Sequence, residues 1–270
     1  MKEHALFACV FIASVVGFDT NPAWGTPHGK QRARNHPTAP RPYVQAMTGW
    51  HAKEPGAKAP LDTNGRPMLV LCTINRSERL EVAALSDEGG FATKDLARIA
   101  HVLRSKGGDE HPVDPRTLNI LYRIQTHFDA HELRIVSGYR TPKPNNHSNH
   151  GKGRAIDFVV PGAPDSKVAE YAREMGFVGV GIYPTSGFVH VDVRPRSYFW
   201  IDYSGPGKRN RERGILPGLA QKSDEQATAR GQRGIEPFEI ISNVDAHLLS
   251  QANASDTSSD DDGEEDESAD

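Results

Sequence analysis

Histidine and aspartate residues recur in this sequence at spacings that suit a metal site. His147 and His150 stand three residues apart in a segment that ends at Asp157, and His190 follows in a segment rich in valine, two residues before Asp192. A catalytic zinc ion takes about three protein ligands, with nitrogen and oxygen donors at about 2.0–2.2 Å, and keeps one position open for water. His150, Asp157 and His190 offer such a set, although a single histidine in a strand is more often an ordinary core or surface residue.

The elements around these residues are expected to hold them against a sheet. The Pro-containing segment 137–146 cannot form a helix and predicts an irregular loop that delivers both His147 and His150. Residues 155–160 and 188–193 predict strands. Alternation within the second strand places its valines on one face and His190 with Asp192 on the other, which we expect to face a cleft.

The neighbouring periodicities predict an α+β fold, in which a small antiparallel sheet has helices packed on it. Two hairpins, the strand 155–160 and one more strand are expected, together with three amphipathic helices. The second helix begins at Asp114-Pro115, which is typical of an N-cap followed by proline in the first turn. The expected hairpins cover 68–83 and 180–193, the strand 133–136, and the helices 93–104, 115–130 and 165–175.

Composition divides the chain into four parts. Residues 1–25 resemble an export signal, with a short apolar run and the small residues Ala23 and Gly25 at a cleavage-site spacing. The apolar run is too short to span a bilayer comfortably. Residues 26–66 are rich in Pro, Gly and basic residues and predict a flexible linker. Residues 67–205 form the expected folded domain, and 206–270 predict a mostly disordered tail with an acidic end. We therefore expect an exported or periplasmic protein with no stable membrane insertion after the signal is removed.

Charge is distributed unevenly along the chain. Residues 256–270 contain nine acidic residues and no basic one, so the net charge of −3 for the whole chain becomes +6 for the remainder. A mildly basic body suits an anionic polymer. No stripe of Lys and Arg with interleaved aromatic residues is present, and we therefore expect no nucleic-acid partner.

Three segments together resemble one family of zinc peptidases. The segment from His150 to Asp157 matches the pattern H-x-x-G-x-A-x-D, and the segments Ser-Gly-Tyr-Arg, ending at Arg140, and Phe-Val-His-Val-Asp, containing His190, also match. This family includes the D-Ala-D-Ala dipeptidases, the murein endopeptidases and the hedgehog signalling domain. The order of elements is most similar to the branch containing murein endopeptidase K, and the resemblance covers about half of the chain.

The resemblance implies roles for individual residues. His150, Asp157 and His190 would bind one Zn²⁺ per chain, and Arg140 would meet a substrate carboxylate or a developing oxyanion. The dipeptidases carry a glutamate base shortly before the last histidine ligand, and residues 185–189 contain no carboxylate. His147 and Asp192 remain as catalytic candidates, Asp192 either as the base or as a group that orients His190.

These inferences lead to three hypotheses about function. The first is an exported zinc metallopeptidase that hydrolyses peptide cross-links between the stem peptides of peptidoglycan. The second is a non-catalytic zinc-containing module that binds cell-wall peptides or a protein partner, which the missing glutamate favours. The third is a cytosolic protein in which the histidine spacing is incidental.

Overall fold

A computed structural model describes residues 38–144, 148–208, 212–214 and 217–234 of the 270-residue chain. These residues all belong to one compact unit. The expected export signal at 1–25 lies outside the described residues. None of the helices in the described ranges combines the length and apolarity that crossing a bilayer requires.

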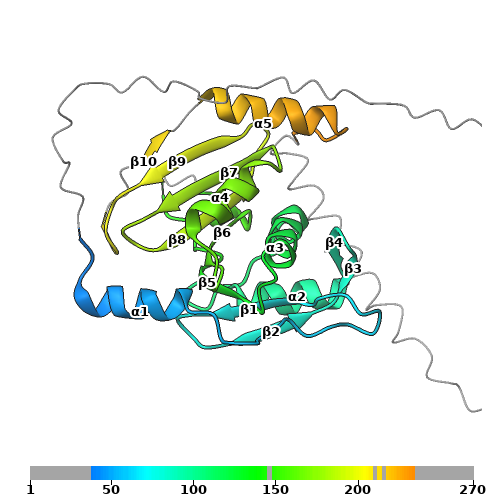
Figure 1. The fold of residues 1–270 in the computed structure, drawn as a ribbon, viewed down its shortest axis with the longest axis horizontal. Helices are drawn as coiled ribbons and strands as arrows, with labels where there is room; N and C mark the ends of the chain where they lie inside the picture. Colours follow the sequence, from blue (N-terminus) through cyan, green and yellow to red (C-terminus); the bar gives the residue numbers. More distant parts are fainter. Residues whose placement is uncertain (1–37, 145–147, 209–211, 215–216, 235–270) are drawn as a thin grey trace, which may run out of the picture. The chain divides into compact units, whose positions relative to one another are not determined.

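The centre of the fold is an eight-stranded sheet with the order β10-β9-β7-β8-β6-β5-β1-β2 (Figure 1). Strand β1 runs parallel to β5, and β7 runs parallel to β9, while the other neighbouring pairs are antiparallel. A separate hairpin consists of β3 and β4. The strands are β1 Leu69–Thr73, β2 Arg79–Val82, β3 Ala84–Ser86, β4 Gly89–Phe91, β5 Leu133–Ser137, β6 Ala155–Val159, β7 Val178–Tyr183, β8 Phe188–Val193, β9 Tyr198–Asp202 and β10 Glu212–Gly214.

Helices α2, α3 and α4 pack on the sheet, with α2 against β2, α3 against β1 and β8, and α4 against β7 and β8 (Figure 1). A single 3-10 turn, η1, lies directly before β6. The helices are α1 Arg41–His51, α2 Thr93–Val102, α3 Pro115–His127, η1 Asn149–Lys152, α4 Asp165–Arg173 and α5 Pro217–Ala229.

Alternation along the central strands separates the core from the polar face. Ile156 and Phe158 of β6 and Val189 and Val191 of β8 are at most 1% exposed and belong to one apolar cluster with the helices. Complete burial of such a side chain contributes roughly 1.5–3 kcal/mol. The residues between them, which point to the opposite face, include Asp157 and His190. The core therefore fixes which side of the sheet carries the polar residues.

The α+β class is confirmed, and the predicted hairpins, the strand at 133–136 and the three helices are all present. Asp114 caps α3 as expected, because its side chain accepts a hydrogen bond from the backbone N–H of Arg116. The sheet differs from the small antiparallel one that we expected. It is larger and mixed, because β9 adds in parallel beside β7 and β1 adds in parallel beside β5.

Helix α1 lies within the segment 26–66 that was expected to be a flexible linker. One side of the helix supplies its contacts: Tyr43 donates a hydrogen bond to the Ser186 carbonyl at 2.8 Å, and the ring of His51 lies 3.1 Å from an oxygen of Asp165. Arg134 on β5 donates to three carbonyl oxygens at the end of α1, including that of Trp50. Tertiary contacts thus order a stretch whose composition alone favours a linker.

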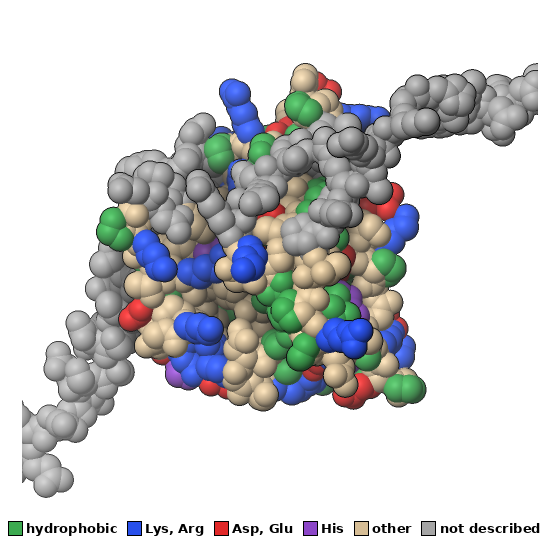
Figure 2. All heavy atoms as spheres, turned by 90° about the vertical axis from the view of Figure 1, so that its left-hand side faces the viewer, with side chains coloured by type: hydrophobic (Ala, Val, Ile, Leu, Met, Phe, Trp, Pro, Cys, Tyr) green, Lys and Arg blue, Asp and Glu red, His purple; other side chains and the backbone are tan. Residues whose placement is uncertain are grey.

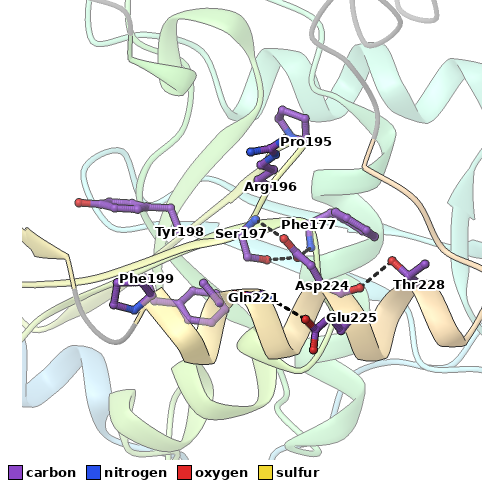
Figure 3. Close-up of a pocket in the computed structure, with 12 residues that line it drawn as sticks. Phe177, Pro195, Arg196, Ser197, Tyr198, Phe199, Gln221, Asp224, Glu225 and Thr228 are labelled. Carbon is purple, nitrogen blue, oxygen red and sulfur yellow. Dashed lines mark hydrogen bonds between the residues drawn. The ribbon is translucent and has the colours of Figure 1, made fainter.

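Helix α5 lies within the expected tail 206–270 and packs against β9. Asp224 fixes it, because its carboxylate accepts hydrogen bonds from the backbone N–H groups of Phe177 and Ser197 and from the Ser197 hydroxyl (Figure 3). A hollow of about 760 Å³ lies between α5 and the start of β9. The expected tail thus includes a helix at 217–229, which the half-buried carboxylate of Asp224 holds against β9. The acidic end of the chain lies outside the described residues.

The surface carries charge of both signs. On the face shown in Figure 2, Lys and Arg side chains stand out at several places, and the acidic side chains lie mostly toward the edges. This distribution agrees with the net positive charge of the chain without its acidic residues 256–270.

The contact between His51 and Asp165 makes the attachment of α1 dependent on pH. The hydrogen bond to Asp165 raises the pKa of His51 above its usual value, against the opposing effect of burial. A raised pKa stabilises the fold while the imidazole is protonated, and this stabilisation is lost as the pH rises through the folded-state pKa. We expect His51→Gln to lower the free energy of unfolding by about 1 kcal/mol near pH 5.5 and by much less near pH 9. Urea unfolding at both pH values measures this, and equal losses would contradict it.

Candidate metal centre

Three donor atoms converge on the polar face of the central strands. Asp157 on β6 pairs in register with His190 on β8, and η1 brings His150 beside them. The distances between His150 Nε2, His190 Nδ1 and Asp157 Oδ1 are 3.2 Å for the two nitrogens, 3.3 Å from His150 to the carboxylate and 2.8 Å from His190 to the carboxylate. Donors around a tetrahedral zinc ion lie about 3.3 Å apart, given bonds of about 2.0–2.1 Å. The three residues can hold a metal ion.

The outward atom of each of these three side chains is held by another group. His150 Nδ1 donates to the carbonyl of Gly138 at 2.8 Å, and His190 Nε2 lies 2.9 Å from the carboxylate of Asp192. The second oxygen of Asp157 accepts a hydrogen bond from Arg140. Such outer contacts fix the tautomer and ring orientation of a metal ligand. They leave the remaining donor atom of each side chain facing the same point.

Electrostatics favour a positive charge at that point. Burial lowers the pKa of His150, against the opposing effect of the Asp157 carboxylate. Burial also opposes ionisation of Asp157, but His150 and Arg140 together hold the pKa of this carboxyl well below its usual range. His190 lies between the carboxylates of Asp157 and Asp192, and its hydrogen bonds to them overcome the effect of burial and raise its pKa to about 9. Two buried carboxylates, Asp157 and Asp192, beside these imidazoles favour a cation, either a proton or a metal ion.

The turn that presents His150 depends on its neighbours in the chain. The Ser148 hydroxyl accepts from the backbone N–H of His150 at the start of η1, and Gly153 ends the turn with φ +63°. A Cβ atom on Gly153 would lie 2.0 Å from the carbonyl oxygen of Pro112. Glycine is therefore required here by a left-handed backbone and by the close approach of the segment before α3.

Aromatic residues form one wall of the site, which opens into a hollow of about 390 Å³. Trp200 on β9 lies 5.0 Å from His190 between ring centroids and donates a hydrogen bond to the Tyr183 hydroxyl. Tyr183 in turn stacks on Phe188. Gly181 makes room for this wall, because a Cβ atom there would lie 2.3 Å from the Trp200 ring. The larger hollow between α5 and the start of β9, shown in Figure 3, is lined by none of the three candidate ligands.

The structure brings five of the six residues singled out from the sequence into this site. Asp192 is 1% exposed, and its carboxylate contacts both His190 and Arg194, which favours an orienting role over that of a base. The Arg140 side chain is 49% exposed, so its guanidinium can reach a ligand while it contacts Asp157. The sixth residue, His147, lies outside the described residues.

Sequence reasoning missed several contributors. Arg194 holds Asp192 through two nitrogens, and the carbonyl of Gly138 orients His150. A backbone carbonyl leaves no residue-type signal, but the charged Arg194, two residues after Asp192, could have been found. The alternating glycines of β7 were a second signal, because small residues in a strand indicate a close approach by another group.

Comparison with known proteins identifies the family. Residues 62–198 match the model of the peptidase family described as peptidoglycan L,D-endopeptidase MepK, and the chain belongs to this family. The resemblance to the branch containing murein endopeptidase K is thereby confirmed. No solved structure gives a significant match.

Two curated relatives illustrate the similarity. The probable peptidoglycan L,D-endopeptidase MepK of Haemophilus influenzae is 34% identical over 142 residues, which cover 47% of this chain and 76% of the relative. The peptidoglycan L,D-endopeptidase MepK of Escherichia coli K12 is 31% identical over 156 residues, which cover 53% of this chain and 85% of the relative. The three candidate metal ligands lie within the matched segment, and α1, α5 and Trp200 lie outside it.

The contact between Asp192 and His190 gives a testable expectation. Replacement of a group that orients a metal ligand typically weakens metal binding by about 10–100-fold. We expect Asp192→Asn to lower zinc affinity by this amount, as measured by competition with a chelating dye. Asp95→Asn is the matched control, because Asp95 is also a buried carboxylate paired with an arginine, Arg98, and lies outside the site. Equal zinc affinity in Asp192→Asn and the unmodified protein would contradict the orienting role.

Proposed function

We propose that the protein is an exported zinc metallopeptidase that hydrolyses peptide cross-links in peptidoglycan. The observation that carries the proposal is the convergence of His150 Nε2, His190 Nδ1 and Asp157 Oδ1, each on a side chain whose other polar atom is held by a neighbour. The donor set of two imidazoles and one carboxylate is one that catalytic zinc takes. Membership in a family described by a peptidoglycan endopeptidase supports the choice of substrate.

The residues around the metal centre have distinct tasks in this proposal. A bound zinc ion supplies a Lewis acid for the peptide carbonyl and makes water a stronger nucleophile near neutral pH. Arg140 offers permanently charged donors to a substrate carboxylate or to the charge that develops on the carbonyl oxygen. Asp192 holds His190 in position, and the wall of Tyr183 and Trp200 limits the access of bulk water.

Hydrolysis also needs a group that accepts a proton from the attacking water. Among the described residues that line the hollow, the only carboxylates are those of Asp157 and Asp192, and both are fully engaged. His147 directly precedes Ser148, which lines the hollow. We therefore assign His147 the role of accepting the proton from water, as the sequence predicted among its alternatives.

Hydrolysis is tested with the full chain, zinc and purified cross-linked muropeptides. We expect release of monomeric muropeptides, loss of this activity on treatment with a chelator, and its recovery on addition of zinc. His150→Ala should reduce the rate by about 1,000-fold or more, because it removes a metal ligand. Liquid chromatography with mass spectrometry identifies the products. Release that persists unchanged in His150→Ala would contradict the proposal.

The role of His147 is tested separately. General acid–base groups contribute roughly 100-fold to 10,000-fold. We expect His147→Ala to lower kcat by at least about 100-fold while the zinc content stays at one ion per chain. His101→Ala serves as the control, because His101 is exposed on α2 and lies outside the site. Full activity in His147→Ala would remove this residue from the chemistry.

The alternative is a zinc-containing module that binds wall peptides without cleaving them. The engagement of both carboxylates in the hollow is the observation that favours it. Tight binding of muropeptides to the zinc-loaded protein without release of monomers would establish this alternative. Export belongs to both proposals, and a secretion reporter fused to residues 1–30 decides it.

A further inference from the structure

A second hollow, of about 560 Å³, adjoins the metal centre. Its lining comes from the end of β1 and the turn after it, from the end of α2 with the loop that follows, and from β5 with the loop that follows. Five of the lining residues are basic and none is acidic, and we call this hollow the basic groove. Its basic residues are Arg76, Arg104, Lys106, Arg140 and Lys143.

The basic groove and the metal centre share structural parts. Arg140 lines both hollows. The wall that contains Gly138 and Tyr139 is fixed against α2, because the Tyr139 N–H donates to the Leu103 carbonyl at 2.8 Å. A Cβ atom on Gly138 would lie 2.5 Å from that same carbonyl, so the two segments are in close contact. The wall that holds His150 therefore also forms a side of the groove, and a ligand that extends past Arg140 enters the groove directly.

The cations of the basic groove are only partly neutralised. Glu78 lies behind two of them: its carboxylate is 2.6 Å from Arg104 and 3.2 Å from Arg76. The hydrogen bonds from Arg104, together with those from Arg76, lower the pKa of Glu78 to about 2, so it is fully ionised at neutral pH. Asp109 lies near the groove and accepts hydrogen bonds from the hydroxyls of Ser105 and Thr141.

The two lysines differ from the three arginines of the groove, each of which contacts a carboxylate of the described residues. Lys106 and Lys143 are both exposed, and no carboxylate of the described residues forms an ion pair with either of them. An isolated surface lysine is usually just solvated, and such a residue contributes little. Here two lysines lie around one hollow with three arginines and no lining carboxylate, and this arrangement attracts anions.

We propose that the basic groove binds carboxylate groups of the peptide substrate, and that Lys106 and Lys143 give the protein a preference for substrates with free carboxylates. The inference rests on the proposed function and adds a specificity site to it. Stem peptides of peptidoglycan carry free carboxylates beyond the bond that is cleaved, and amidation of these groups removes their charge. Charge-assisted hydrogen bonds are roughly twice as strong as neutral ones, so the groove distinguishes the two forms.

The test compares two substrates with two proteins. The substrates are one cross-linked muropeptide with free carboxylates and the same muropeptide with those carboxylates amidated. The proteins are the full chain and the double variant Lys106→Gln with Lys143→Gln. For the unmodified protein we expect kcat/KM to be about tenfold higher with the free carboxylates, mainly through a lower KM. The double variant should lose this preference while its kcat and zinc content stay unchanged.

A matched control double variant carries Lys94→Gln and Lys222→Gln. Both lysines are exposed on helices, α2 and α5, and neither lines the groove or the metal centre. We expect this control to keep the full preference for free carboxylates. The preference of the unmodified protein should also shrink as salt concentration rises, because salt screens exposed charges.

The remaining outcomes of this test distinguish failure of the basic groove from failure of the proposed function. Cleavage of both muropeptides at equal rates by the unmodified protein would overturn the groove and leave the proposed function intact. A double variant that keeps the tenfold preference would also overturn the groove. Cleavage of neither muropeptide would contradict the proposed function, and the groove as its specificity site would be lost with it.

Discussion

Asp157 is a carboxylate with 2% exposure in the middle of an eight-stranded sheet, and the structure around it is organised to accommodate that charge. A buried carboxylate is costly unless it is paired and hydrogen-bonded. Its neighbours come from separate parts of the chain: His150 from η1, His190 from β8 and Arg140 from the loop after β5. Each of these parts is therefore tied to β6, and the loss of any one partner weakens the compensation of a buried charge.

This arrangement couples the stability of the fold to the orientation of the donor atoms in the metal centre. The same contacts that make Asp157 tolerable also orient three donor atoms toward one point. Asp192 is a second buried carboxylate, and it contacts both His190 and Arg194. The site thus contains two groups of ion pairs, one around Asp157 and one around Asp192, and His190 belongs to both. The backbone hydrogen bonds between β6 and β8 keep the two groups in register.

The sequence predicted the parts of this site that depend on local periodicity. Strand alternation placed Asp157 on one face of its strand and His190 with Asp192 on one face of theirs, and the register between the two strands brings them together. The position of Trp200 could not be predicted in this way. It depends on the parallel pairing of β9 with β7, which sets Trp200 opposite Gly181, and such long-range pairing leaves no signal in either segment alone. Helix α1 was missed for a related reason, because tertiary contacts stabilise it more than its own composition does.

The place of Trp200 has a consequence for how this enzyme family can diversify. The segment that matches the family ends at residue 198, and Trp200 reaches back across β7 to lie beside His190. The metal ligands lie on η1, β6 and β8, whereas Trp200 comes from β9 and reaches the site through the parallel pairing of β9 with β7. Changes in β9 can reshape the wall that faces a substrate without altering any donor atom. One part of the surface that faces a substrate can in this way change while the metal ligands stay the same.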